Sequence, residues 1–231
     1  MNSYNYSKVE SSFIDLLNRL MNEVININSN FKLYKHLIDR LKDRRDAMEY
    51  APSFFNTVLE ALFADVVMSL AKLFETERRG SYGNLHTYLK FVTDNKEIFS
   101  LDERFRRDPN IGALEDYIKE GFKIEIEDLL KEHENLIKEQ GVRIDILLHW
   151  RDKYYAHNDK RYFINPSLIA EEMPLLYDDI DKLIDTTTKI LNAYSVRFDG
   201  KFKLNYFSNY DDIDKILDIV HEYHLKMLNE D

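Results

Sequence analysis

Residues 52–75 read PSFFNTVLEALFADVVMSLAKLFE, and this stretch decides the class of fold. Apolar side chains recur in it every three or four residues, and pairs such as Phe54-Phe55 and Leu62-Phe63 make it apolar around most of a helical circumference. The proline at its start suits the first turn of a helix. We therefore predict that residues 52–75 form the central, buried helix of the protein.

Similar patterns with a single apolar stripe surround this segment. They predict helices over residues 7–27, 30–48, 84–94, 113–140, 142–156, 176–199 and 211–228. The charged residues 104–109 are expected to form a mobile connector, and residues 202–207 alternate weakly enough for a short extended piece. Because no linker is visible, we expect a single domain over residues 1–231, with 200–231 as a C-terminal extension helix.

Composition agrees with an all-α fold. Of 231 residues, 44% are hydrophobic, so the chain can build a sizeable core, whereas six glycines and four prolines are too few for the turns of sandwiches and barrels. The absence of cysteine excludes disulfide frameworks, thiolate catalysis and cysteine-ligated metal sites.

The formal net charge of −10 disfavours wrapping a long nucleic-acid duplex, although it leaves room for a local basic site. The first residues, MNSYNY, lack a basic leader region, and no run approaches eighteen apolar residues. We expect a cytoplasmic protein with no membrane partner.

The stretch that carries chemistry is residues 147–161, LLHWRDKYYAHNDKR, at the end of the predicted 142–156 helix. Basic side chains outnumber acidic ones around it. The basic residues are Arg143, Arg151, Lys153, Lys160 and Arg161, and the acidic ones are Asp145, Asp152 and Asp159. A local positive excess on an acidic protein indicates a localised anion site.

An arginine followed by a polar residue and, five residues further, by a histidine that ends the helix resembles the R-x(4 to 6)-H motif of HEPN domains. Here the motif residues are Arg151, Asp152 and His157. The surrounding RDKYYAHND, together with ALFADVVMSLAKLFE at residues 61–75, is similar to the abortive-infection U-type (AbiU-like) branch of bacterial HEPN proteins. The resemblance extends over roughly residues 5–195.

This resemblance implies an all-α, HEPN-like helical bundle with additional flanking helices. It also implies a homodimer in which two Arg-His pairs share a cleft and cut RNA without a metal or cofactor, as a toxin or antiviral effector. Arg151 and His157 would be catalytic, with Asp152 in the family's polar position. Some relatives carry a tyrosine two residues after the histidine that a partner nucleotidyltransferase modifies. Asp159 stands there instead, which argues against that antitoxin mode, while an antitoxin or other defence-system protein remains an expected partner.

The chemistry of the residues supports the same role. RNA carries its own nucleophile, the 2′-hydroxyl, so an enzyme needs only to orient it, move a proton and neutralise the charge that grows on the phosphate. Histidine titrates near neutral pH, and arginine stays charged and binds phosphate in bidentate fashion. Side chains expected to support the reaction, hold neighbouring phosphates or stack on a base are Lys153, Lys160, Arg161, Tyr154 and Tyr155.

Plainer interpretations stand beside this one. Arg151 can pair with a carboxylate on a neighbouring helix, His157 can stabilise its helix end by its charge, and Trp150 and Tyr154 fit a core better than a stacking platform. The fold would then serve a non-catalytic module that binds RNA, a nucleotide or a protein, or a dimeric scaffold in which Arg151 and His157 form interface salt bridges.

Metal chemistry has weak support in the sequence. Asp218 and His221 stand three residues apart, as in the carboxylate-x-x-His element of di-iron bundles, and His224 follows, but a second such element is missing. The sequence also lacks a glycine-rich phosphate loop, a G-x-S-x-G elbow and an H-E-x-x-H motif. We expect no bound metal.

Overall fold

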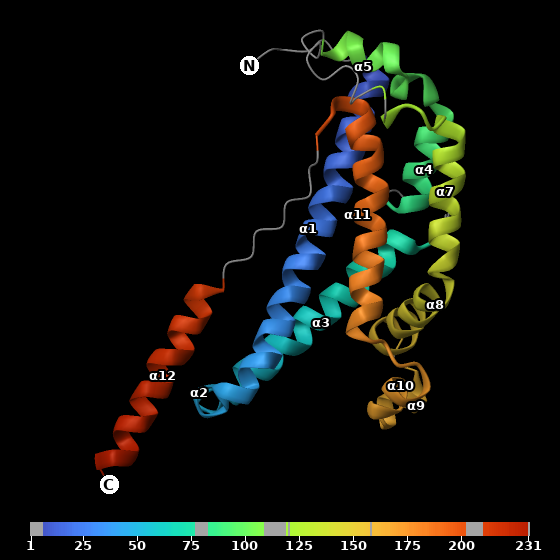
Figure 1. Ribbon diagram of the computed structural model, residues 1–231. Coiled ribbons are helices and arrows are strands. Elements are labelled where there is room, and N and C mark those ends of the chain that lie inside the picture. The colour runs from blue at the N-terminus through green and yellow to red at the C-terminus, as the bar shows by residue number, and fades with distance from the viewer. Residues whose placement is uncertain are drawn as a thin grey trace. The chain divides into compact units, whose positions relative to one another are not determined.

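The computed structural model of the chain describes residues 7–76, 83–108, 119, 121–157, 159–201 and 210–230. Within these ranges every regular element is helical, which confirms the predicted all-α class (Figure 1). The chain divides into two compact units, Met1–Val24 with Ser69–Asn205 and Ile25–Met68 with Tyr206–Asp231. The single domain expected over residues 1–231 stays a prediction, and the extended piece expected at 202–207 lies outside the described residues.

The helices follow one another with short connections. They are α1 (Lys8–Asp43), α2 (Arg45–Glu49), α3 (Pro52–Phe74), α4 (Leu85–Asp94), a 3₁₀ turn (Lys96–Phe99), α5 (Leu101–Arg107), α7 (Ile126–Glu139), α8 (Gly141–His149), a π-helical segment (Trp150–Ala156), α9 (Lys160–Ile164), α10 (Ser167–Glu172), α11 (Tyr177–Asp199) and α12 (Asp211–Glu230). The predicted ends of α3, α4 and α12 lie within two residues of those observed.

Helix α1 corrects one prediction, because the two helices expected over 7–27 and 30–48 are a single helix up to Asp43. The polar run Asn28-Ser29-Asn30 suggested a break. Asparagine and serine lower helix stability by less than about 1 kcal/mol each, however, and the burial of Ile27 and Phe31 on either side outweighs that cost.

Helix α11 occupies the centre of the first unit. It contacts α5, the 3₁₀ turn, α7 and α8 (Figure 1), and its buried side chains run from Ile180 to Phe198. Gly200 ends it with a φ of 76°, a left-handed conformation that glycine adopts without strain. Segment 52–75 is therefore central only in part: the buried residues of α3 lie between Val66 and Phe74, whereas Phe54 near its start is 62% exposed.

Residues 104–107 are not part of the mobile connector that the sequence predicted over 104–109, since they belong to helix α5. Residue 109 lies outside the described residues. The Arg107 guanidinium is buried, pairs with Glu10 at 2.8 Å and donates from Nε to the carbonyl of Phe198 at 2.8 Å. Burial raises the pKa of Glu10, but hydrogen bonds from Ser7 and Arg107 outweigh it and hold that pKa below its usual value. A buried ion pair thus joins α1, α5 and the end of α11.

In the second unit, α12 packs on α2 through Ala47, Met48 and Leu217. Ion pairs and hydrogen bonds flank this small core. They join Asp214 to Arg40 and His36 (both 2.8 Å), Asp218 to Arg44 (2.8 Å), His221 to Asp46 (2.6 Å) and His224 to Tyr50 (3.1 Å). The hydrogen bond from Arg40 lowers the pKa of Asp214.

A buried histidine makes the first unit sensitive to acid. His133 on α7 is 1% exposed, and its Nδ1 lies 3.0 Å from the hydroxyl of Tyr194 on α11. Burial lowers the pKa of His133 to about 4.

Between pH 6.5 and 4 the unfolded chain therefore binds a proton at His133 that the folded chain does not, so stability should fall as the pH decreases through this window. The full shift corresponds to roughly 3 kcal/mol. Urea unfolding at pH 7 and pH 5 measures the part of this shift that lies above pH 5, about 2 kcal/mol, with His133→Gln as the control that lacks the titrating ring. Equal pH slopes for parent and variant would contradict the prediction.

Candidate functional site: the Arg151–His157 segment

Within the predicted helix 142–156, the backbone hydrogen-bond pattern changes at Trp150. Residues 141–149 form α8, and Trp150–Ala156 continue it as a π-helix, whose hydrogen bonds span five residues in place of four. The wide turn closes where the N–H of Asp159 donates to the carbonyl of Lys153 at 2.9 Å. π-Helical turns are rare in proteins, and those that occur are often found at functional sites. The π-helical segment contains the residues from Arg151 through Tyr155, and it ends at His157.

Aromatic packing fixes the π-helical segment. Nε1 of Trp150 donates to the carbonyl of Met173 at 2.7 Å, which ties the segment to the end of α10. The Trp150 ring centroid lies 5.6 Å from that of Tyr154, and the Tyr154 and Tyr155 rings meet edge to face at 4.9 Å. The two tyrosines are half-buried in this cluster. Their predicted role as stacking platforms for a base stays a prediction.

Arg151 is 8% exposed and sits between two carboxylates. Its Nε donates to Oδ1 of Asp152 at 2.7 Å, and its Nη1 lies 3.3 Å from Oε1 of Glu75. Glu75 directly follows helix α3, so the contact joins the π-helical segment to the central core. This is the kind of pairing that the plainer interpretation of Arg151 anticipated.

His157 differs from Arg151 in its surroundings. It is the exposed residue at which the π-helix ends, and its ring forms no hydrogen bond or ion pair with the described part of the chain. A buried, charged guanidinium and an accessible imidazole thus stand on one short segment. Asp159, where some relatives carry tyrosine, caps α9 by accepting from the N–H of Arg161 at 3.0 Å.

Several basic side chains around the segment already carry counter-charges. Arg143 binds Asp179 at 2.9 Å, and Arg161 lies 3.3 Å from Glu172 with its guanidinium over the Tyr162 ring. Lys153 and Lys160 are exposed and form no ion pair with any residue that the structure describes. Of the basic residues inferred from the sequence, only these two lysines therefore lack an ion-pair partner within the described residues, because Asp179, Glu172 and Glu75, in other parts of the fold, pair with the arginines.

Sequence reasoning missed Glu75 and Glu172. Glu75 is the last residue of the segment 61–75 that carried the resemblance, which is the only signal that pointed to it. Glu172 accepts from the hydroxyl of Tyr162 at 2.8 Å, and that hydroxyl also lies 2.9 Å from Nε2 of His149. This chain of contacts holds α9 and α10 against α8.

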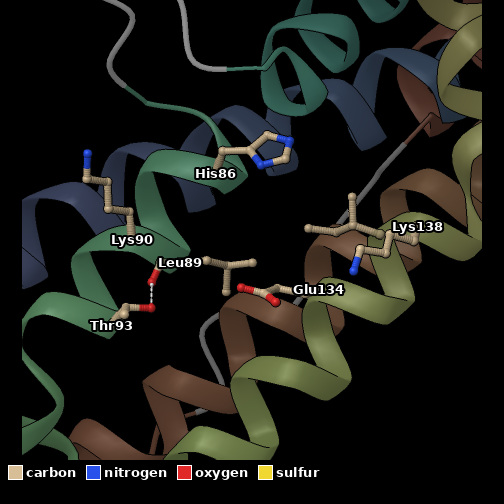
Figure 2. Close-up of a pocket in the computed structure, with 7 residues that line it drawn as sticks. His86, Leu89, Lys90, Thr93, Glu134 and Lys138 are labelled. Carbon is tan, nitrogen blue, oxygen red and sulfur yellow. Dashed lines mark hydrogen bonds between the residues drawn. The ribbon is translucent and has the colours of Figure 1, made fainter.

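A separate hollow of about 420 Å³ lies between α4 and α7 (Figure 2). Leu89 and Ile137 provide its apolar surface, and His86, Lys90, Thr93, Glu134 and Lys138 complete the lining. Thr93 donates its hydroxyl to the carbonyl of Leu89 at 2.9 Å. Since its charges are of both signs and its hydroxyl is used internally, the hollow does not present converging donors to an anion, and it shares no residue with the Arg151–His157 segment.

The three residues that suggested a di-iron element are each engaged elsewhere: Asp218 with Arg44, His221 with Asp46, and His224 with Tyr50. Across the described ranges, no group of three or more His, Asp or Glu side chains could hold a metal ion. Among the helices of the same ranges, none is long and apolar enough to span a membrane.

The described part of the chain is all-helical. It carries a buried arginine, an acidic residue directly after it and an exposed histidine at the end of the same helical segment. These are the features of a HEPN protein. The chain belongs to the AbiU2 family of HEPN proteins, because the family model HEPN_AbiU2 matches residues 10–225. No curated protein and no solved structure matches the chain. The resemblance drawn from residues 61–75 and 151–159 is thereby confirmed at the level of the family.

We predict that Tyr162→Phe destabilises the first unit by about 1–2 kcal/mol, because it leaves His149 and Glu172 without their shared hydroxyl partner. Urea denaturation monitored by circular dichroism measures the loss. Tyr223→Phe, on the exposed face of α12, is the matched control and should stay within about 0.5 kcal/mol of the parent. Equal midpoints for the two variants would show that the hydroxyl contributes nothing.

Proposed function

We propose that this protein is a metal-independent endoribonuclease that acts as a toxin or antiviral abortive-infection effector in the cytoplasm. The observation that carries the proposal is the pairing, on one π-helical segment, of a buried Arg151 with an exposed His157 in a chain of the AbiU2 family. Other members of the same site are Asp152 and the lysines at 153 and 160.

The proposed reaction uses the RNA's own 2′-hydroxyl. Its oxygen attacks the adjacent phosphorus, the bond from phosphorus to the 5′-oxygen breaks, and the products are a 2′,3′-cyclic phosphate and a 5′-hydroxyl. His157 takes the proton of the nucleophile or supplies one to the leaving oxygen. Arg151 stabilises the negative charge that grows on the phosphate oxygens.

Removing either side chain tests this chemistry. We expect His157→Ala to lower the cleavage rate by about 10²–10⁴-fold and Arg151→Ala by about 10²–10³-fold, with circular dichroism unchanged for the histidine variant. Cleavage of total cellular RNA should survive EDTA, spare DNA and leave cyclic phosphate ends. A double variant that cuts as fast as the parent would place the activity elsewhere.

Lys160→Ala separates binding from chemistry. As a contact to a neighbouring phosphate, Lys160 should contribute to affinity in a salt-dependent way without changing the maximal rate. Lys182→Ala, which removes a lysine paired with Asp178 on α11, is the matched control.

The proposed site is completed by a second copy of the chain, and exposed apolar residues near the segment support this assembly. Three apolar residues flank the segment on α8 and α9. Val142 and Phe163 are each 74% exposed, and Ile164 is 70% exposed. A homodimer in which the 142–157 helices approach across a twofold axis would cover them.

We therefore predict a dimer in light scattering at micromolar concentration, which the double change of Phe163 and Ile164 to Asp converts to monomer. Ile216→Asp, at a position on α12 that is 60% exposed, is the control and should leave the dimer intact. A monomeric parent at these concentrations would refute the assembly.

A non-catalytic module is the second candidate, and one observation favours it: the two carboxylates beside Arg151 offset the attraction of its guanidinium for phosphate. Such a module would bind RNA, a nucleotide or a protein partner such as an antitoxin or another defence protein. RNA binding by a pure dimer that leaves the RNA uncut would support this candidate over the nuclease.

A further inference from the structure

The guanidinium of Arg151 contacts carboxylates through two of its nitrogens and has no bonded partner among the described residues at the third. Nε is bonded to Asp152 and Nη1 faces Glu75, which together define both the position and the plane of the group. Nη2 has no hydrogen-bond partner within the described part of the chain. The free edge of the fork is the edge that can meet a phosphate.

Asp152 and Glu75 differ in how they can position the guanidinium of Arg151. Asp152 is the next residue on the same π-helical segment, with its side chain 38% exposed, so it moves with the arginine that it contacts. Glu75 belongs to another element and its side chain is 22% exposed. It directly follows Leu73 and Phe74, which are buried in the core at the end of α3. Of the two carboxylates, Glu75 is therefore the one that relates the guanidinium to the rest of the fold.

We infer that Glu75 is a positioning residue of the proposed nuclease, which holds Arg151 with its Nη2 edge toward the scissile phosphate of an RNA strand. The inference rests on the proposed function for the identity of the substrate. Glu75 acts through Arg151 and does not itself touch RNA.

The contact has two opposite consequences for catalysis. Correct placement of the guanidinium raises the chemical rate, and a displacement of about 1 Å can cost on the order of 10²-fold. The charge of Glu75, by contrast, repels the phosphate and weakens binding of RNA. The length and the charge of the Glu75 side chain can be changed separately. Asp keeps the charge on a shorter side chain, whereas Gln keeps the length and an acceptor oxygen without the charge.

Steady-state cleavage by the Glu75 variants of the full chain is the test. Glu75→Asp should lower kcat by about 10–100-fold with KM nearly unchanged, because the shorter carboxylate no longer reaches Nη1. Glu75→Gln should retain kcat within about threefold and lower KM, because an acceptor remains and the repulsion is gone. A merely structural role would lower the melting temperature of both variants and leave kcat per folded molecule unchanged.

Asp185→Asn is the matched control, since it removes one negative charge from the exposed face of α11 and should leave kcat at the parental value. Nitrogen-15 spectra of the arginine side chains give a readout that needs no activity. Slow rotation of the Arg151 guanidinium, abolished in Glu75→Asp and kept in Glu75→Gln, supports the anchoring.

The outcomes separate the two proposals. A parent that cuts no RNA but shows a restrained Arg151 would defeat the nuclease and leave the anchoring role in place. An active parent whose Glu75→Asp variant cuts at the parental kcat, or a parent with a freely rotating Arg151, would overturn the inference about Glu75.

Discussion

The ion pair between Glu10 and Arg107 lies almost wholly out of water, and the first unit depends on it. A charged guanidinium is stable in such a place only when a carboxylate and carbonyl oxygens replace the water that it has lost. Glu10 supplies the charge from α1, and the carbonyls of Ile98 and Phe198 accept from the remaining nitrogens. Three elements far apart in sequence are thereby held in one arrangement.

Arg151 is subject to the same constraint but satisfies it differently. It is about as buried as Arg107, and it too has carboxylate partners, yet its Nη2 edge is not bonded to the described residues. All three nitrogens of the Arg107 fork are bonded within the unit. In Arg151, Nε and Nη1 contact carboxylates, and Nη2 has no hydrogen-bond partner among the described residues.

The π-helix explains how such an arginine and an exposed histidine come to share one segment. Trp150 anchors the segment by its bond to Met173, and the tyrosine rings fill the space beside it, so the widened turn is supported from within the unit. His157 lies where the regular turns end and the next helix has not yet begun, which exposes its ring to solvent. Burial of the arginine and exposure of the histidine are thus two results of one local geometry.

The sequence by itself determined the all-α class, the ends of α3, α4 and α12, and the family, because apolar periodicity, caps such as Asn84 and the Arg151–His157 spacing are local features. It misjudged α1 and residues 104–107, where weak local signals gave way to burial of Phe31 and Arg107. Only the tertiary structure decided which charged side chains form ion pairs with one another. Ion pairs such as Arg151 with Glu75 and Arg161 with Glu172 join residues whose proximity comes from helix packing, which sequence spacing alone does not encode.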